Sequence, residues 1–281
     1  MKTGIYTHEP RQQYNDDPGM RSSVVAKGDT STKHMRHAAT TENEQTDAMV
    51  KGTCLHLALL EAERFENEVA IYPGKGNRGS KEYKEFVLCN PGTNILLPAA
   101  AREVVGMVES VLSDPRAKDF LAGCKAEVAF YWETEEYGRG KALLDGWGSG
   151  TIKEIKTAAQ ITPKRFAAHA YDMKYHIRAG WYRMGVRELA GELLPVELCV
   201  IESKAPFDVA FYEYDEYALG VGMDRALEIA TNYRACEKAG HFPGINQDIQ
   251  TLHLPAWVRE NEADMDKRLE KLDTMNASEL V

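Results

Sequence analysis

LLDGWGSGTIKEIKTA, residues 143–158, is the stretch that decides the predicted fold. An apolar strand pattern that carries Asp145 is followed by a glycine-rich turn and by a second strand pattern with Glu154 and Lys156. Residues equally far from the centre of an antiparallel turn face each other, so a turn near Ser149 places Asp145 opposite Glu154. Side chains alternate along a strand, and Lys156 therefore shares the face of Glu154.

An earlier strand pattern adds a third acid. AEVAFYWE, residues 126–133, alternates as a strand does, and a turn at YGRG, residues 137–140, joins it to the strand of Asp145. Glu127 then lies within about one residue pair of facing Asp145, and the three acids form a row across strands roughly 4.8 Å apart. A divalent cation would relieve their repulsion, and oxygen ligands favour Mg²⁺ or Mn²⁺. Lys156 would then orient or deprotonate a metal-bound water, which suits phosphodiester hydrolysis.

The bulk composition bounds the class of protein. With 281 residues, of which 43% are hydrophobic, the chain is long enough for one large domain or two small ones. The sequence has neither an apolar run long enough to span a membrane nor a secretion signal, so a cytoplasmic protein is expected. The five cysteines are scattered without a C-x-x-C pair, which argues against an iron–sulfur cluster.

The charge distribution favours a local anion-binding surface. A net charge of −9 argues weakly against a protein that coats nucleic acid. Residues 151–187, however, hold eight basic and two acidic side chains, a local excess of 8 − 2 = 6 positive charges. A DNA channel can therefore be positive within an acidic protein. A solvated helix face is the alternative explanation of the individual charges.

Helical patterns surround the predicted sheet. Asp47 is a plausible N-cap of the first, Asp114-Pro115 interrupts the second, and Thr162 precedes Pro163 at the start of the third. The predicted helices cover residues 47–65, 97–123, 162–184 and 216–238, and two later strands cover residues 196–203 and 207–214.

The row of acids and the lysine resemble the core motif of the PD-(D/E)XK nuclease superfamily, an acid followed on the next strand by an acid, any residue and a lysine. Asp145 is the first acid here, and EIK, residues 154–156, is the second element. Over roughly residues 20–258 the chain resembles the RecE-like (exodeoxyribonuclease VIII-type) phage recombination exonucleases. The resemblance implies an α/β (α+β), restriction-endonuclease-like fold in which helices flank a mixed sheet with an antiparallel meander.

Two more segments carry this resemblance. GTCLHLALLE, residues 52–61, matches the G-x-x-x-H helix of such nucleases and supplies His56. A lone histidine in an apolar segment is otherwise more often a core residue than a ligand. YHIRAGWY, residues 175–182, corresponds to their Y-x-x-Q helix, with Arg178 in place of the usual glutamine. An arginine suits a phosphate because it is always charged and can bind two oxygens.

The resemblance also implies roles for these residues. The site would hold Mg²⁺, for which Mn²⁺ could substitute, and Lys156 would activate water. Glu127 would help to hold a second metal, and His56 would approach the metal or the scissile phosphate. The implied metal ligands are Asp145, Glu154, the carbonyl of Ile155, Glu127 and His56. The implied catalytic residues are Lys156, Glu154, Asp145 and His56, and the residues expected to bind DNA are Tyr175, Arg178, Lys164, Arg165 and Lys174.

The function implied is a magnesium-dependent exonuclease that degrades linear double-stranded DNA from 5′ to 3′ and leaves 3′ overhangs for strand annealing. Its expected partner is a single-strand annealing protein, its expected assembly a ring-forming homo-oligomer, and its expected location the cytoplasm of a bacterial or phage-infected cell. Two alternatives stay open: a single-strand-specific or endonucleolytic RecB-like nuclease, and a non-catalytic DNA-binding module. The predicted division is a poorly ordered segment 1–45, a nuclease domain 46–258 and an acidic tail 259–281.

Overall fold

The computed structural model divides the chain into two units, Met1–Gly244 and Ile245–Val281. The helices and strands below belong to the first unit. The acidic tail predicted over residues 259–281 lies largely outside the described residues. Among the residues described, no helix is both long and apolar enough to cross a membrane. The structure describes residues 1–41, 45–75, 77–245, 248–253, 267–270 and 272.

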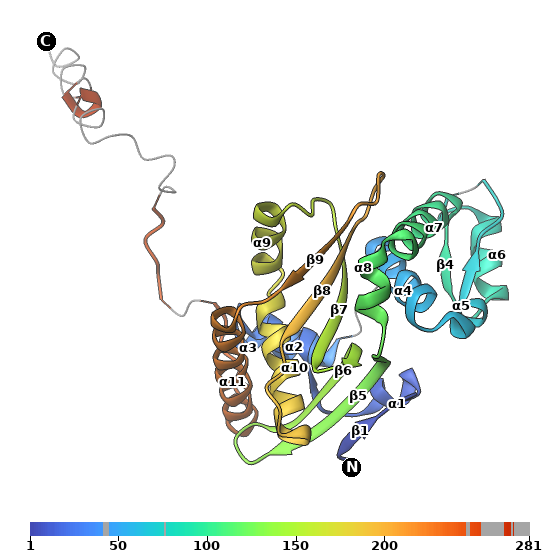
Figure 1. Ribbon diagram of the computed structural model, residues 1–281. Coiled ribbons are helices and arrows are strands. Elements are labelled where there is room, and N and C mark those ends of the chain that lie inside the picture. Colours follow the sequence, from blue (N-terminus) through green and yellow to red (C-terminus); the bar gives the residue numbers. More distant parts are fainter. Residues whose placement is uncertain (42–44, 76, 246–247, 254–266, 271, 273–281) are drawn as a thin grey trace, which may run out of the picture. The chain divides into compact units, whose positions relative to one another are not determined.

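A mixed sheet forms the centre of the first unit (Figure 1). Its strands are β1 (Gly4–Tyr6), β2 (Met20–Arg21), β5 (Lys125–Thr134), β6 (Gly138–Gly148), β7 (Thr151–Ala158), β8 (Val196–Glu202) and β9 (Val209–Glu213). Their order is β1-β5-β6-β7-β8-β9, and β2 pairs with β6. The meander β5-β6-β7 is antiparallel, whereas β7 and β8 run parallel. This arrangement confirms the predicted fold class.

The register of the meander brings Glu127 opposite Asp145 as predicted, but the β6–β7 ladder ends at the pair of Gly146 and Lys153, before it reaches Asp145 and Glu154. Ala126 pairs with Gly146 and Val128 with Leu144, so Glu127 lies opposite Asp145 of β6. The turn between these strands lies at residues 135–137, and the turn predicted at residues 137–140 is wrong. Gly140 is instead a strand residue, and the position takes a glycine because the indole of Trp132 fills the space that a side chain would need.

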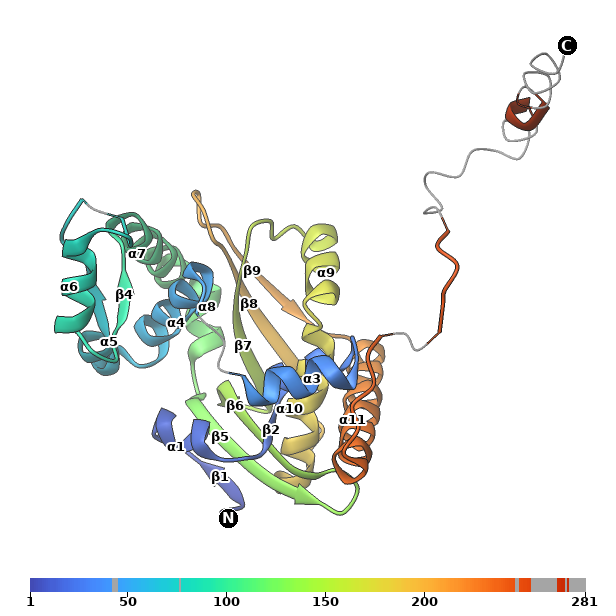
Figure 2. The same ribbon diagram turned by 180° about the vertical axis from the view of Figure 1, so that it is seen from behind.

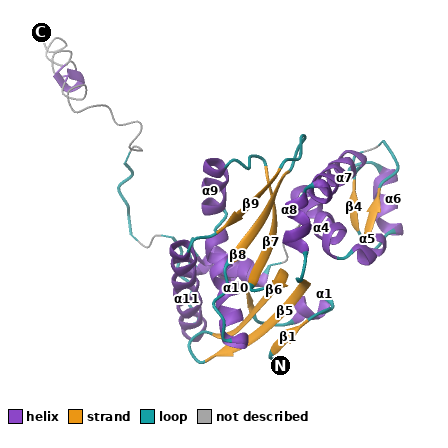
Figure 3. Cartoon of the chain, in the orientation of Figure 1, coloured by secondary structure: helices purple, strands orange, loops and turns teal. Residues whose placement is uncertain are grey.

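Helices cover both faces of the sheet (Figure 3). On one face pack α2 (Ser22–Gly28), α3 (Thr32–Thr40), α10 (Tyr175–Ala190) and α11 (Glu216–Ala239). On the other face pack α4 (Asp47–Leu60), α7 (Pro98–Ser113) and α8 (Pro115–Leu121). Ile152 and Ile155 of β7 belong to the two different cores, as alternation along a strand requires.

Two predicted helices are broken in the structure. The helix predicted over residues 47–65 ends at Leu60 and is followed by α5 (Ala62–Glu68), and its N-cap is Thr46 rather than Asp47. The third predicted helix is divided into α9 (Pro163–Asp172) and α10, because Lys174 adopts a left-handed backbone conformation between them. The apolar stripe continues across this break, which is why periodicity alone missed it.

The first 41 residues were expected to be poorly ordered, and that expectation is wrong. They contain β1, β2, α2, α3 and α1 (Arg11–Asp16), and β1 pairs with β5 along the edge of the sheet. Within this segment the sequence pattern predicts one short helix near residues 32–39, and it is present as α3. We call residues 1–21 the N-terminal arm; it lies beside β5 and β6 in both views (Figures 1 and 2).

A small second sheet lies between α5 and α7 in the chain. Its parallel strands are β3 (Val69–Ile71) and β4 (Asn94–Leu96), and α6 (Lys81–Cys89) connects them. The rings of Tyr72, Tyr83 and Phe86 form its core by edge contacts.

Candidate metal centre

The row of acids lies where two strands of the central sheet separate. β6 and β7 pair only from Gly146 to Gly148, and farther along β6 the strand β2 takes a pairing position at Gly140. Asp145 is the first residue of β6 beyond the β7 pairing, and its Oδ2 accepts a hydrogen bond from the Ile155 N–H at 2.7 Å. The carboxylate therefore bridges the two strands at the point where their ladder ends.

Three potential metal ligands converge at this point. One side-chain atom from each of His56, Glu127 and Asp145 lies within 4.8 Å of the others. His56 comes from α4, which is held against the sheet by the fully buried Cys54 and Leu55 directly before it in the chain. The predicted convergence of α4 with the meander is thus present, and four elements of secondary structure contribute to the site.

The imidazole of His56 bridges Asp145 and β7. Its Nδ1 lies 3.3 Å from Asp145 Oδ1, and its Nε2 lies 3.1 Å from the carbonyl oxygen of Ile155. Both ring nitrogens face acceptors, an arrangement that suits a doubly protonated ring. Burial opposes that charge, but Asp145 outweighs it and raises the pKa of His56. A cation bound through His56 would therefore displace a proton.

Burial and mutual repulsion divide the ionisation of the two facing acids. Burial, together with the charge of Asp145, raises the pKa of Glu127 to about 7. Burial acts in the same direction on Asp145, but His56 and Lys156 outweigh it and lower the pKa of that carboxyl. Asp145 is therefore the anion of the pair, and a metal cation bound beside Glu127 would favour ionisation of that second carboxyl.

Glu154 and Lys156 form an ion pair on the α10 face of β7. The Lys156 ammonium donates to Glu154 Oε2 and, at 3.1 Å, to the carbonyl of Ile155, and it lies 3.6 Å from Asp145 Oδ2. Burial lowers its proton affinity, but the two carboxylates outweigh this effect and raise the pKa of Lys156. The lysine is thus a fixed cation in this structure.

The donor set fits a hard divalent cation. Glu154 Oε1 is buried and accepts no hydrogen bond from the described part of the chain. An orphaned buried carboxylate oxygen is costly unless a cation or another donor satisfies it. Glu154 lies outside the cluster of His56, Glu127 and Asp145, but the carboxylates of Glu127 and Asp145 are oxygen ligands of the kind that Mg²⁺ and Mn²⁺ prefer. The residues present therefore fit the predicted metal, with His56 as a nitrogen neighbour.

Tyr175 and Arg178, the two predicted residues on α10, also lie at the site. The Tyr175 ring centroid lies 5.8 Å from Lys156 Nζ and 5.6 Å from the Arg178 guanidinium. Arg178 Nε is buried without a hydrogen-bond partner among the described residues, and Arg178 Nη2 donates to Tyr182 Oη at 3.4 Å. The buried hydroxyl of Ser22 donates to the same Tyr182 oxygen. A cationic group with an unused donor thus lies beside Glu154.

Three predicted DNA-binding residues lie apart from this cluster. Lys164 and Arg165 are exposed near the start of α9, and within the described residues no hydrogen bond or ion pair joins them to it. Lys174 forms an ion pair with Asp29 at 2.8 Å, and Arg225 shares that carboxylate. The structure therefore divides the predicted basic surface into a central residue, Arg178, and a peripheral group.

Sequence reasoning missed two contributors to the site. Arg11 of α1 donates from Nη2 to Glu127 Oε2 at 2.9 Å, although 116 residues separate the two in sequence. Ser22 contacts Tyr182 although 160 residues separate the two in sequence. Helical spacing places Tyr182 on the face of Arg178, but no local pattern indicates either partner from the first 41 residues.

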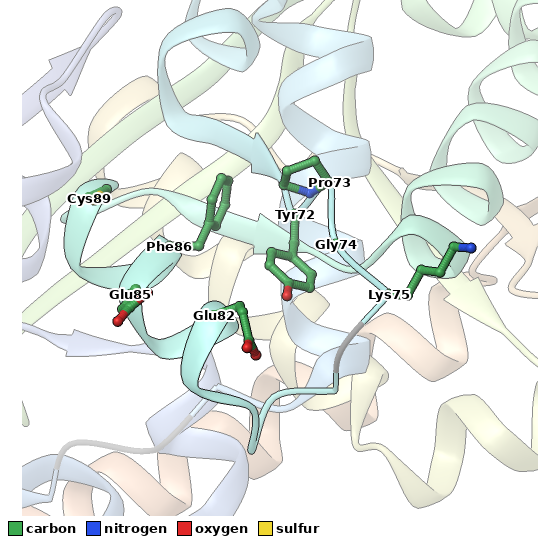
Figure 4. A pocket seen from close by; sticks show the side chains of 8 residues that line it. All are labelled: Tyr72, Pro73, Gly74, Lys75, Glu82, Glu85, Phe86 and Cys89. Carbon is green, nitrogen blue, oxygen red and sulfur yellow. The ribbon is translucent and has the colours of Figure 1, made fainter.

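A cavity of about 170 Å³ borders the cluster on the α4 side of the sheet. Asp145 and Ile155 form one wall, and the rest is mostly apolar, with side chains from α4, α8 and β5. A hollow of about 550 Å³ lies elsewhere, beside the rings of Tyr72 and Phe86 and the acids Glu82 and Glu85 (Figure 4). None of the predicted site residues lines that second hollow.

Similarity to solved structures is consistent with this fold. A structure from Eubacterium rectale described as a "putative exonuclease" has a TM-score of 0.61 and 16% identity, covering 89% of this chain and 96% of that one. At this identity the likeness shows the fold alone. A structure of SSO0001 is also 16% identical, and the match covers 76% of this chain and 88% of that one. Its TM-score of 0.27 is too low to indicate a shared fold.

No curated protein matches the sequence. The family described as "PDDEXK-like domain of unknown function (DUF3799)" matches residues 23–255, which is most of the chain. The matched range includes the acids, the lysine and the α10 residues of the cluster, and it begins after the N-terminal arm. The chain belongs to this PDDEXK-like family.

Proposed function

We propose that this protein is a divalent-metal-dependent exonuclease that hydrolyses phosphodiester bonds of linear double-stranded DNA. The observation that carries the proposal is the convergence of His56, Glu127 and Asp145 within 4.8 Å, with the Lys156 ammonium 3.6 Å from Asp145. A cluster of acids alone is common in proteins, but a fixed cation at its edge is the arrangement that hydrolysis of an anionic diester needs.

The oxygens available for Mg²⁺ come from Asp145, Glu154, Glu127 and the Ile155 carbonyl. When bound, the metal would polarise the phosphoryl oxygens and lower the pKa of a water molecule. His56 holds Asp145 and the Ile155 carbonyl in their relative positions through its two ring nitrogens. This bridge supports the oxygen ligands even if the imidazole itself stays outside the coordination shell.

The cationic groups have separable tasks. Lys156 is held between Glu154 and Asp145, where it can orient water and offset negative charge that develops on the phosphate. Arg178 lies on the adjacent helix, and its Nε, which has no hydrogen-bond partner among the described residues, suits a phosphate oxygen of the bound strand. Lys164 and Arg165, exposed on α9, would add weaker, salt-dependent contacts farther along the DNA.

The finer parts of the proposal follow the resemblance to RecE-like enzymes. We propose degradation from 5′ to 3′, 3′ overhangs as the product, recombination by strand annealing as the role, and a single-strand annealing protein as the partner. A ring-forming homo-oligomer would keep the enzyme on its DNA. The family match and the similarity of fold to a "putative exonuclease" support this direction.

One assay tests the proposal. The protein is incubated with linear duplex labelled at the 5′ or the 3′ end, with single strands and with closed circular duplex, each with Mg²⁺ or EDTA. We expect Mg²⁺-dependent loss of the 5′ label from linear duplex and no cutting of the circle. Cutting of the circle would indicate an endonuclease, preference for single strands a RecB-like enzyme, and DNA binding without cleavage a non-catalytic module.

A further inference from the structure

Arg11 lies at the edge of the candidate metal centre without belonging to the nuclease motif. Its Nη2 donates to Glu127 Oε2 at 2.9 Å, and its side chain is 43% exposed while that of Glu127 is 9% exposed. The guanidinium thus reaches from the surface onto a buried carboxylate. This contact engages one carboxylate oxygen, and the second oxygen of Glu127 stays available to a cation.

Glu127 needs an external partner to hold its orientation. Its backbone has a positive φ of 48°, a conformation that a non-glycine residue rarely adopts, and it forms no ladder pair with the residue opposite. The side chain also has several rotatable bonds. Without a second contact, the carboxylate can rotate away from Asp145 and His56.

The N-terminal arm that carries Arg11 is anchored by two buried cations of β6. Lys141, which is 4% exposed, donates to the carbonyls of Tyr14 and Asp17 at 2.6 Å and of Asn15 at 3.3 Å. Arg139 donates to the Asp17 carboxylate, and both side chains are 8% exposed. Two buried charges therefore fix the end of α1.

The arm is also attached to β5, the strand of Glu127. Tyr6 of β1 pairs with Ala129, two residues from Glu127, and the Tyr14 ring packs against the Tyr131 ring. The arm thus spans both strands that supply the facing acids, and Figure 2 shows α1 and β1 beside β5. These contacts with β5 and β6 hold α1 in one position, and in that position Arg11 contacts Glu127.

We propose that Arg11 is a positioning residue of the metal centre: it orients the Glu127 carboxylate, and divalent-cation affinity depends on it. The inference rests on the metal centre of the proposed function and on no step of DNA cleavage. An arginine near a cation also repels it, so the two effects of Arg11 on the affinity for a divalent cation oppose each other. The orienting effect exceeds the repulsion, in the range of about 10–100-fold in affinity found for residues that hold metal ligands.

Calorimetric titration with Mn²⁺, in the absence of DNA, tests which of these two effects on the affinity is larger. We expect Arg11→Ala to weaken binding by at least about tenfold. Arg11→Lys keeps a cation and a single donor, which is all that the observed contact uses, so it should restore most of the affinity. Unchanged or tighter binding by Arg11→Ala, or no rescue by lysine, would overturn the proposal.

Arg234→Ala is the matched control. Arg234 is 46% exposed and pairs with Glu237 at 3.1 Å, so its loss removes a similar surface ion pair. The Arg234 side chain lies near Gly138 of β6. Gly138 and Asp145 are seven residues apart on this strand, which corresponds to about 23 Å in an extended chain. We expect its Mn²⁺ affinity to equal that of the unmodified protein. An equal loss in both variants would show a general effect of surface charge and would overturn the proposal.

A second measurement separates positioning from folding. Mn²⁺ that binds the native state raises the unfolding temperature, and the rise depends on affinity. We expect the Mn²⁺-induced rise to shrink in Arg11→Ala while the melting temperature without metal stays within a few degrees. If the protein binds Mn²⁺ in this Arg11-dependent way but cleaves no DNA, the proposed function fails and this inference stands. If the unmodified protein binds no Mn²⁺, this inference fails.

Discussion

The β6–β7 hairpin and the N-terminal arm both build the candidate metal centre, but in different ways. In the hairpin, one turn sets β6 against β7, and Lys156 of β7 lies close to both Asp145 and Glu154. In the arm, Arg11 meets Glu127 across 116 residues, and no periodicity connects them. Local register therefore predicts the strands that carry the acids, whereas the residue that contacts Glu127 comes from a segment that looks irregular.

The largest effect should come from the hairpin. Asp145→Asn keeps the shape of the side chain but removes the anion that faces His56, Glu127 and Lys156. We expect cleavage of linear duplex to fall by about a thousand-fold or more, which is about 4 kcal/mol of transition-state stabilisation. Single-turnover cleavage measures this. Asp114→Asn at the N-cap of α8 is the control and should cleave normally; a comparable loss there would point to misfolding.

Lys156→Met separates chemistry from metal binding within the hairpin. The ammonium offsets charge on Glu154 and Asp145, so its removal leaves the carboxylates free for a cation. We expect cleavage to fall by about a hundred-fold or more while Mn²⁺ affinity is kept or increases. Titration with Mn²⁺ beside single-turnover cleavage measures both. Loss of metal binding in this variant would mean that the lysine is structural.

Asp17→Ala tests how strongly the arm is anchored. Its removal leaves the buried Arg139 unpaired, and we expect the free energy of unfolding to fall by about 3 kcal/mol at neutral pH. Burial opposes ionisation of Asp17, but Arg139 and the Gly19 N–H outweigh it and lower the pKa of the carboxyl.

The sign of the pH dependence follows from that lowered pKa. The stabilisation is complete above the ordinary carboxyl value of about 4 and is lost as the pH falls through the lower folded value. Denaturant unfolding at several pH values should therefore show the difference between the two proteins shrinking below about pH 4. A difference that grows on acidification would contradict the buried pair.

The smallest effect concerns the turn of the hairpin. Gly150 has a φ of 76° and open space where a side chain would be, so Gly150→Ala should cost about 1 kcal/mol of stability through backbone strain alone. In Gly148→Ala the new carbon would lie 2.8 Å from the Gly123 carbonyl, and a larger loss is expected. Thermal melts rank the two. Equal losses would show that the turn relaxes, and that pairing with β8 rather than the turn sets the register of β7.

Sequence patterns predicted the meander and the approach of Glu127 to Asp145, because both follow from strand alternation and from turns, whereas Tyr175 and Arg178 were indicated by the family resemblance. They failed at Lys174, where a single left-handed residue divides a helix without interrupting its apolar stripe. They also failed for the arm, because its polar residues are buried by partners on β6 that lie more than 120 positions away. Burial of this kind depends on tertiary contacts, which composition does not record.

The most direct test of the central claim is the anomalous scattering of Mn²⁺ in a crystal of the protein. We predict a peak between β6 and β7 within coordination distance of Asp145 and the Ile155 carbonyl, with Glu154 or Glu127 completing the oxygen ligands. The same peak should be absent in Asp145→Asn. A metal bound only elsewhere on the surface, or a peak that persists in that variant, would contradict a metal centre at this row of acids.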